Sequence, residues 1–225
     1  MHNIKYYKKL WTGKTSGELN PKWSYEDDCK ELEQFLDNKK YDCLELGCGN
    51  GELYAVAMKH YNSYCGVDFS KSNIEIFKKK NSGIELHCAD VVDFIPEKKA
   101  SLIHSNQLLQ YLTKSQIKSL IKSNIENCSD NGIIIHRQIP DRRLRRLYFL
   151  GYLKPNVNYI KLNQLIFPIL YNLYTFFKKI TFSHSDFGFW YNTNEILEIC
   201  DELGVKGEIF GSSLYRYRFN LLIRT

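Results

Sequence analysis

The chain has 225 residues, of which 44% are hydrophobic and 25% charged, and its formal net charge is +6. This length fits one α/β domain, and the balance of hydrophobic and charged residues is that of a globular protein, so we expect no long disordered tail. The charge is moderate and the basic residues are scattered, so composition alone gives no evidence for a nucleic-acid partner.

The start of the chain and its cysteines add two expectations. The first nine residues contain no apolar stretch of the kind that a secretory signal needs, so we expect a cytoplasmic protein. The seven cysteines include no C-x-x-C pair, so we expect reduced thiols, with neither a disulfide framework nor a metal site.

Short apolar runs alternate with segments of helical period over the first two thirds of the chain. This alternation predicts a mostly parallel sheet with crossover helices on both faces, a doubly wound α/β fold. The predicted strands are 41–46, 63–68, 84–88, 100–105 and 132–138. The predicted helices are 52–60, 71–80 and 114–127, with Ser70 and Thr113 as N-caps of the last two.

The C-terminal part predicts a helix at 193–203, capped by Thr193 and closed by Gly204. Two apolar strands, near 205–210 and 213–223, would then add an antiparallel edge and bring the sheet to seven strands. The segment 139–192 is too long for an ordinary loop and is predicted to be a substrate-binding insertion or lid. Residues 1–40 would form a helical cap, 41–138 the ligand-binding half and 193–225 the closing helix and strands.

Three glycines spaced by two residues, Gly47, Gly49 and Gly51, follow the first predicted strand and precede a helix. Glycines at such a turn let the backbone approach a ligand that a Cβ would exclude. The spacing G-x-G-x-G differs from the dinucleotide pattern G-x-G-x-x-G, and no Walker-type lysine follows. We therefore do not expect a phosphate in this loop.

Two carboxylates end the next two predicted strands. Asp68 closes the second strand, where it is placed to accept hydrogen bonds from both hydroxyls of a ribose. Asp90 follows the third strand, where it is placed to accept from an adenine amino group. The ends of three strands therefore predict one nucleoside pocket.

Three short motifs of this chain resemble, in order and spacing, the first motifs of class I (Rossmann-like) S-adenosylmethionine-dependent methyltransferases. They are Glu45-x-Gly47-x-Gly49-x-Gly51, Gly66-x-Asp68-x-Ser70 and Ala89-Asp90. The resemblance covers about 41–138. It implies S-adenosyl-L-methionine as cofactor, with the glycine loop at its methionine part, Glu45 near its amino group, and the two aspartates at ribose and adenine. The implied cofactor-binding set is Glu45, Gly47, Cys48, Gly49, Gly51, Asp68, Phe69, Asp90, Val91 and Asn106.

Methyl transfer is an in-line displacement, so alignment of the reactants is the main requirement and a base is needed only if the acceptor must lose a proton. His136 ends the fifth predicted strand, and its ordinary pKa near neutrality makes it a candidate general base. Tyr111 is a second candidate, with helix packing as the alternative. Many relatives carry an acidic residue and a histidine where this chain has Gln110 and Tyr111, which weakens the transfer of a base from the family.

The acceptor itself is expected to be a small polar metabolite, phosphorylated or sugar-like. Arg142 and Arg146 lie one helical turn apart and would suit an anionic group, with a solvated helix face as the alternative. The aromatic stretch around His184 resembles the segment that closes over the acceptor in many small-molecule methyltransferases. The predicted substrate-binding residues are Gln107, Arg137, Arg142, His184, Trp190 and Tyr191.

The apolar and aromatic stretch 162–177 is too short and too polar to span a bilayer. A lid over the acceptor or a homodimer contact is its favoured role, and a membrane-surface helix is the alternative. Two other functions remain open. One is an RNA methyltransferase, and the other is a non-catalytic subunit that binds S-adenosylmethionine beside a catalytic partner.

Overall fold

A seven-stranded sheet forms the centre of the computed structural model, which describes residues 24–149, 153 and 188–225. The strand order is β3-β2-β1-β4-β5-β7-β6; the first five strands along the chain are parallel, and β7 is antiparallel to both of its neighbours. The predicted doubly wound fold with an antiparallel edge is confirmed. The strands are β1 (Tyr41–Leu46), β2 (Tyr61–Asp68), β3 (Glu85–Cys88), β4 (Ala100–Asn106), β5 (Cys128–Pro140), β6 (Gly207–Gly211) and β7 (Arg218–Arg224).

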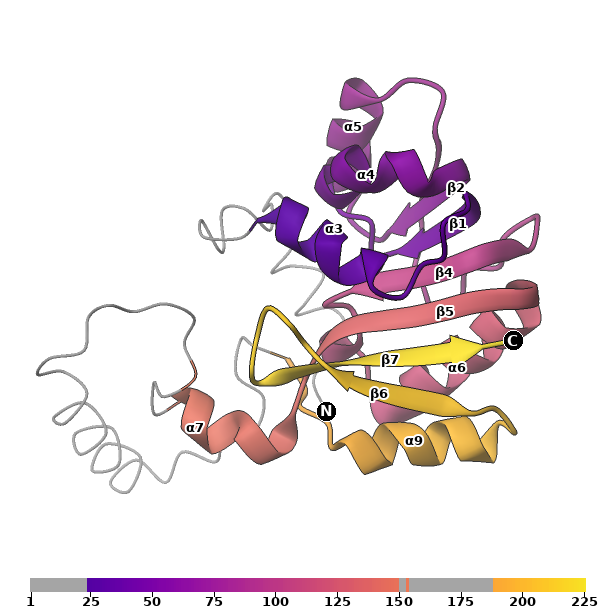
Figure 1. Cartoon of the computed structure of the whole chain (residues 1–225). Helices are drawn as coiled ribbons and strands as arrows, with labels where there is room; N and C mark the ends of the chain where they lie inside the picture. Colours follow the sequence, from indigo (N-terminus) through magenta and orange to yellow (C-terminus); the bar gives the residue numbers. More distant parts are fainter. Residues whose placement is uncertain (1–23, 150–152, 154–187) are drawn as a thin grey trace, which may run out of the picture.

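Helices cover both faces of this sheet (Figure 1). One face carries α3 (Tyr25–Glu33), α4 (Glu52–Ala57) and α5 (Lys71–Lys80), and the other carries α6 (Lys114–Asn127) and α9 (Thr193–Glu202). The remaining elements are η1 (Met58–His60), η2 (Leu109–Tyr111), η3 (Arg142–Leu144) and α7 (Arg145–Phe149).

Side chains alternate between the two cores as the period of a strand requires. In β5, Ile133 and Ile135 pack under α3 and α4, whereas Ile134 packs under α6 and α9. This alternation matters for the site, because it decides the face on which each later residue of β5 lies.

The ends of the helices follow their capping residues. Ser70 accepts a hydrogen bond from the Asn73 amide at the start of α5, and Thr113 forms a capping box at the start of α6, as predicted. The predicted cap Thr193 is wrong: Asn192 caps α9, because its side chain and that of Glu195 form a reciprocal capping box.

Several predicted boundaries also change. The helix predicted at 52–60 divides into α4 and the 3-10 turn η1, and β2 begins two residues early, at Tyr61. The last two strands lie at 207–211 and 218–224 rather than 205–210 and 213–223. The largest difference is β5, which extends from Cys128 to Pro140, so residues 136–138 lie within the strand and not at its end.

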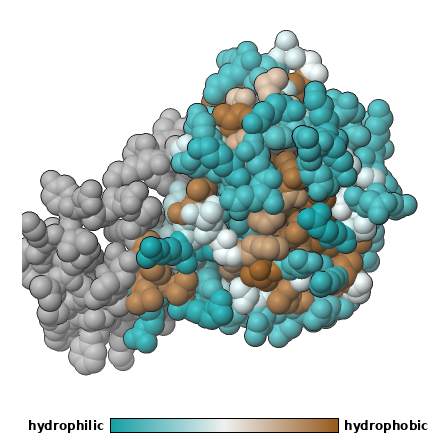
Figure 2. Space-filling model, viewed as in Figure 1, coloured by the Kyte–Doolittle hydropathy of each residue, from teal (hydrophilic) through white to brown (hydrophobic). Residues whose placement is uncertain are grey.

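Hydrophilic side chains cover most of the face seen in Figure 2, and hydrophobic side chains gather near its middle, over the sheet. In the part of the chain that the structure describes, no helix is long and apolar enough to cross a membrane. The predicted lid or dimer stretch 162–177 and the predicted substrate residue His184 lie outside the described residues.

Candidate functional site

The glycine loop connects β1 to α4. Gly47, Gly49 and Gly51 all have positive φ angles, of 75°, 55° and 81°, a region that favours glycine. A Cβ on Gly51 would lie 2.4 Å from the ring of Phe77, whereas a Cβ on Gly49 would meet nothing within 4 Å. Gly51 is therefore required for packing, and Gly49 presents bare backbone to open space.

The loop is fixed to the end of β2 by backbone hydrogen bonds. The amides of Gly47 and Cys48 donate to the carbonyl oxygen of Val67 at 2.8 and 3.0 Å. The Cys48 side chain is 5% exposed and packs in the cluster beneath α5, and burial holds the pKa of its thiol well above the usual range. Only the backbone of Cys48 can therefore face a ligand at this loop.

Asp68 ties the loop to the end of β2. Its Oδ2 accepts from the Gly49 amide at 3.0 Å and its Oδ1 accepts from the Ser70 amide at 2.8 Å. Burial raises the pKa of this carboxyl group. Each carboxylate oxygen offers about two lone-pair sites, so each keeps one for a further donor, which is the arrangement that two vicinal hydroxyls require.

The end of β3 lies directly beside Asp68. The Ala89 amide donates to the Asp68 carbonyl oxygen at 3.1 Å, and Asp90 follows. Asp90 is half-buried, and its Oδ1 accepts from the Val92 amide at 3.2 Å. Val91 is buried in the core, and Phe69 is half-buried after Asp68. The structure thus brings the predicted ribose and adenine carboxylates to one edge of the sheet.

Asn106 completes this edge from β4. It follows Ser105, which pairs with Leu46, so it lies beside the start of the glycine loop. Its Oδ1 is buried and has no hydrogen-bond partner among the residues described. A buried acceptor without a donor costs about 1–3 kcal/mol, which a bound donor would recover.

Glu45 is buried within β1, on the face covered by α3. Its carboxylate accepts from the Tyr64 hydroxyl at 2.6 Å. Burial raises its pKa to about 7, while the Tyr64 bond and the charge of Arg137 act in the opposite direction. A cation at this position would lower that pKa and favour the carboxylate.

These residues fit a nucleoside. The open space at Gly49, the free lone pairs of Asp68 and the unpartnered oxygen of Asn106 lie at the carboxyl ends of neighbouring parallel strands. In open α/β sheets this edge is where ligands bind. Among the residues that the structure describes, the groups named here for this fit are hydrogen-bonding atoms and bare backbone rather than cations.

His136 requires a correction. The prediction placed it at the end of a strand, but it lies inside β5, on the α6 face, and is 0% exposed. Its Nδ1 lies 2.8 Å from the Ser105 Oγ and its Nε2 lies 3.2 Å from the Asn124 Nδ2. Burial lowers its pKa to about 4. Both ring nitrogens bond within the core, so His136 does not meet an acceptor as a general base.

Arg137 is also corrected from a substrate ligand to a buried structural residue. It is 0% exposed, and its Nη1 donates to the Asp28 carbonyl oxygen at 2.6 Å. Its Nη1 lies 3.7 Å from a carboxylate oxygen of Asp28 and of Glu31, which are also buried. The guanidinium therefore holds α3 against β5.

Three further predicted substrate residues bond to other parts of the protein; the Arg142 side chain is exposed, whereas Trp190 and Tyr191 are buried. Arg142 donates from Nε to the Trp190 carbonyl oxygen at 3.0 Å and from Nη1 to Glu195 at 2.9 Å.

Trp190 is 5% exposed and its ring contacts those of Tyr148 and Tyr217. Tyr191 is 4% exposed and its hydroxyl donates to the Leu112 carbonyl oxygen. These contacts attach residues 188–192 to the sheet, and the substrate role of Tyr191 stays a prediction.

Gln107 and Tyr111 lie at the same edge as Asn106. Gln107 has a φ of 57°, and its amide donates to the Arg137 carbonyl oxygen at 3.0 Å. Tyr111 belongs to η2 and is half-buried. Their places are compatible with the predicted lining of an acceptor pocket, which stays a prediction.

The predicted set missed Arg218, at the start of β7. Its Nη1 donates to the Gln138 carbonyl oxygen at 2.5 Å and its Nη2 donates to the Gln110 Oε1 at 3.2 Å. The guanidinium lies 5.9 and 5.2 Å from the ring centroids of Tyr215 and Tyr217. Among the residues described, its buried Nε has no hydrogen-bond partner. The two oxygens that accept from its other nitrogens belong to neutral groups. Only its membership of a basic cluster near the C-terminus signalled it in the sequence.

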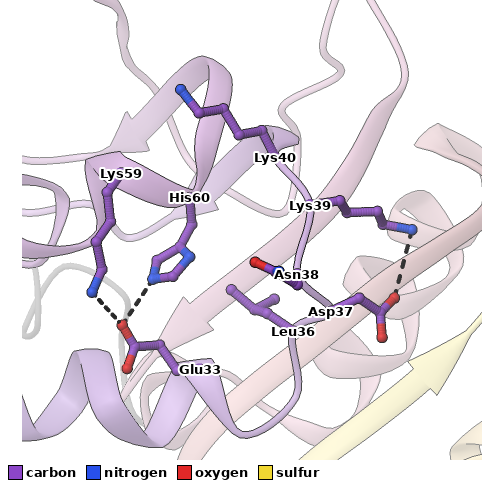
Figure 3. Close-up of a pocket in the computed structure, with 8 residues that line it drawn as sticks. All are labelled: Glu33, Leu36, Asp37, Asn38, Lys39, Lys40, Lys59 and His60. Carbon is purple, nitrogen blue, oxygen red and sulfur yellow. Dashed lines mark hydrogen bonds and ion pairs between the residues drawn. The ribbon is translucent and has the colours of Figure 1, made fainter.

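A polar pocket lies on the molecule away from these strand ends. It is lined by Glu33, Leu36, Asp37, Asn38, Lys39, Lys40, Lys59 and His60, from the end of α3, the turn before β1, and η1 (Figure 3). These segments lead into the amino ends of β1 and β2, opposite the glycine loop. The pocket is therefore separate from the candidate nucleoside site.

Comparison with known proteins gives a consistent picture. Residues 43–132 match the methyltransferase domain family. The chain is 30% identical over 158 residues to phosphoethanolamine N-methyltransferase 1 of Zea mays, which covers 61% of this chain and 30% of the relative. It is 34% identical over 89 residues to malonyl-[acyl-carrier protein] O-methyltransferase 1 of Ilyobacter polytropus, which covers 36% of this chain and 33% of the relative. The matches thus span about a third of these curated relatives.

Among solved structures, the N-methyltransferase NodS of Bradyrhizobium japonicum, in complex with S-adenosyl-L-homocysteine, has a TM-score of 0.62 at 16% identity, over 98% of this chain and 95% of that chain. This likeness shows the shared fold. The fold and the strand-end carboxylates define a class I methyltransferase architecture. The domain match agrees with this architecture, because the matched residues 43–132 run from β1 into β5 and include the strand ends that carry both carboxylates.

Proposed function

We propose that the chain binds S-adenosyl-L-methionine at the carboxyl ends of β1 to β4 and transfers its methyl group to an oxygen or nitrogen of a small polar, anionic metabolite. The convergence of Gly49, Asp68 and Asn106 at one edge carries the proposal. The domain match over 43–132, which spans these strands, supports it independently.

When bound, S-adenosyl-L-methionine supplies a methyl group on a positively charged sulfur. The chain's own residues hold the nucleoside and the amino acid part in place. Asp68 accepts from the ribose hydroxyls through its free lone pairs, and Asp90 accepts from the adenine amino group. The buried Oδ1 of Asn106 accepts from the amino group of the methionine part, and Glu45 supplies a nearby carboxylate.

His136 is committed to the core, which leaves Tyr111 as the remaining predicted candidate for proton transfer at the acceptor. Alignment of nucleophile, methyl and sulfur is then the main contribution of the protein, and alignment of this kind supplies on the order of 7–11 kcal/mol. The proposal therefore favours acceptors whose nucleophile is already deprotonated, such as a carboxylate, an amine or an ionised hydroxyl.

Two observations support an anionic acceptor. The names of the two curated relatives describe acceptors with a phosphate group and with a malonyl carboxylate. In this chain, Arg218 presents a guanidinium held by neutral groups, and hydrogen bonds through Gln110 link it to the carbonyl oxygen of Gln107, beside Asn106. A guanidinium recognises carboxylate and phosphate through paired hydrogen bonds. Arg142, the predicted anion ligand, is already paired with Glu195.

The test is incubation of the purified chain with methyl-labelled S-adenosylmethionine and fractionated metabolite extract, followed by mass identification of the labelled product. We expect label in a small acidic metabolite, and none with a folded Asp68→Ala variant. Cofactor binding without transfer to any fraction would instead indicate a non-catalytic subunit, and label in RNA alone would refute the small-molecule acceptor.

A further inference from the structure

Cys65, Glu85 and His87 form a cluster at the edge of the sheet, outside the proposed nucleoside pocket. The parallel register pairs Cys65 of β2 with Glu85 of β3, and His87 lies two residues further along β3, on the same face. One potential ligand atom from each residue lies within 4.8 Å of the other two. The backbone of two paired strands therefore fixes the spacing of a thiol, a carboxylate and an imidazole.

We propose that Cys65, Glu85 and His87 bind one Zn²⁺ ion. A thiolate, an imidazole nitrogen and a carboxylate oxygen are the ligand types that zinc takes in proteins, and a set with sulfur excludes magnesium and calcium as the preferred ions. This assignment departs from the sequence analysis, which expected no metal because the cysteines lack C-x-x-C spacing. Pairing across two strands produces the cluster without such a motif.

The charges around the cluster favour a cation. Burial and the negative charges of the Glu85 and Glu97 carboxylates together raise the pKa of the Cys65 thiol to about 12. In the described part of the chain, no lysine or arginine forms an ion pair with Glu85 or Glu97. The positive charge of Lys98 lowers the pKa of Glu85 without such a contact.

The ligands are also accessible and oriented. The His87 and Glu85 side chains are 36% and 54% exposed, so an ion can reach them from solvent. The His87 Nε2 already lies 2.8 Å from the Glu85 Oε1, and its ring packs against Phe94 at a centroid distance of 4.9 Å. Binding replaces the thiol proton of Cys65, which passes to solvent, so the site carries a thiolate when the ion is bound.

A second cluster with the same ligand types, Cys29, Glu33 and His60, is less suited to zinc. Lys59 and His60 both point at the Glu33 carboxylate (Figure 3), and the Lys59 ammonium lies 2.8 Å from its Oε1. A divalent cation would have to displace this ammonium. The edge cluster has no such competitor among the residues described, which is why the proposal selects it.

The test uses the full chain, stripped of metal by a chelator and titrated with Co²⁺ as a spectroscopic substitute for Zn²⁺. We expect one equivalent to give a thiolate-to-cobalt charge-transfer band and tetrahedral visible bands, and Zn²⁺ to remove both by displacement. Cys65→Ser should abolish the charge-transfer band. His87→Gln, at a half-buried position, should weaken binding at least tenfold.

The matched control is Cys88→Ser, since Cys88 is exposed and lies next to His87 on β3. This variant should retain the wild-type band. The proposal is overturned if no charge-transfer band forms, if the band survives in Cys65→Ser or His87→Gln at wild-type affinity, or if Cys29→Ser removes it.

Discussion

Replacing Asp68 by asparagine tests the nucleoside pocket at its best-defined atom pair. Each carboxylate oxygen holds one backbone amide, from Gly49 and Ser70, and keeps one lone pair for a ribose hydroxyl. Asparagine keeps one acceptor oxygen and replaces the other by a donor. The change therefore removes one charge-assisted hydrogen bond, worth about 1.5–3 kcal/mol, which corresponds to roughly 10- to 150-fold in affinity.

The assay is isothermal titration calorimetry with S-adenosyl-L-homocysteine, which avoids turnover. Asp68→Asn should bind with a dissociation constant raised by that factor. The control is Asp93→Asn. Asp93 is exposed on the segment after β3, so this substitution removes the same charge without touching the pocket. Its affinity should stay within about twofold of wild type.

Folding must be checked because the new amide faces a backbone N–H of the glycine loop or of Ser70. Far-ultraviolet circular dichroism and a thermal melt identify a variant that has lost the fold, and Asp90→Asn at a half-buried position then serves as the second probe of the same pocket. Wild-type affinity in a folded Asp68→Asn protein would refute the assignment of Asp68 to the ribose.

Other substitutions test the remaining assignments. Burial raises the pKa of Glu45 to about 7 in the folded chain. The protonated side chain therefore contributes to the free energy of unfolding below the pKa that Glu45 has in the unfolded chain, and this contribution is lost as pH rises through 7. Chemical denaturation from pH 4 to 8 should therefore show wild type losing on the order of 3 kcal/mol relative to Glu45→Gln, and parallel curves would contradict this. His136→Ala should lower the free energy of unfolding by about 2–4 kcal/mol because it leaves a cavity and two unpaired groups. The shape of its pH–rate profile near neutrality should be unchanged, whereas loss of a neutral-pH titration would restore His136 as a base. With the acceptor identified, Arg218→Gln should raise KM about tenfold or more, with Arg216→Gln, at an exposed position, as control; equal KM values would remove Arg218 from the site. Asn192→Ala should cost about 1 kcal/mol by loss of the α9 cap, and an unchanged melting temperature would argue against that capping box.

The elements that were predictable from sequence are those with local signals. The helix 71–80 and the helix 114–127 have the predicted bounds, because a cap, an apolar period and a strand beyond each end specify them. The glycine loop and the two aspartates follow strand ends, and parallel strands bring such ends together whatever the rest of the chain does. The cofactor half of the site was therefore open to prediction.

The acceptor side depends on contacts between distant segments. His136 and Arg137 looked like strand-end residues, because the apolar run stops at Ile135. The strand continues to Pro140, since the partners that satisfy these polar side chains come from α6 and α3. No local pattern shows that Asp28 and Glu31, on a helix rich in acidic residues, are buried. The place of Arg218 depends in the same way on the pairing of β7 with β5.

The most direct test of the central claim is equilibrium dialysis of the purified chain with methyl-labelled S-adenosylmethionine in the presence of competing nucleotides. We predict saturable binding of one cofactor per chain, displaced by S-adenosyl-L-homocysteine and left intact by equal concentrations of ATP or NAD⁺. Absence of saturable binding, or equal displacement by ATP or NAD⁺, would contradict a nucleoside pocket built for S-adenosylmethionine at the ends of β1 to β4.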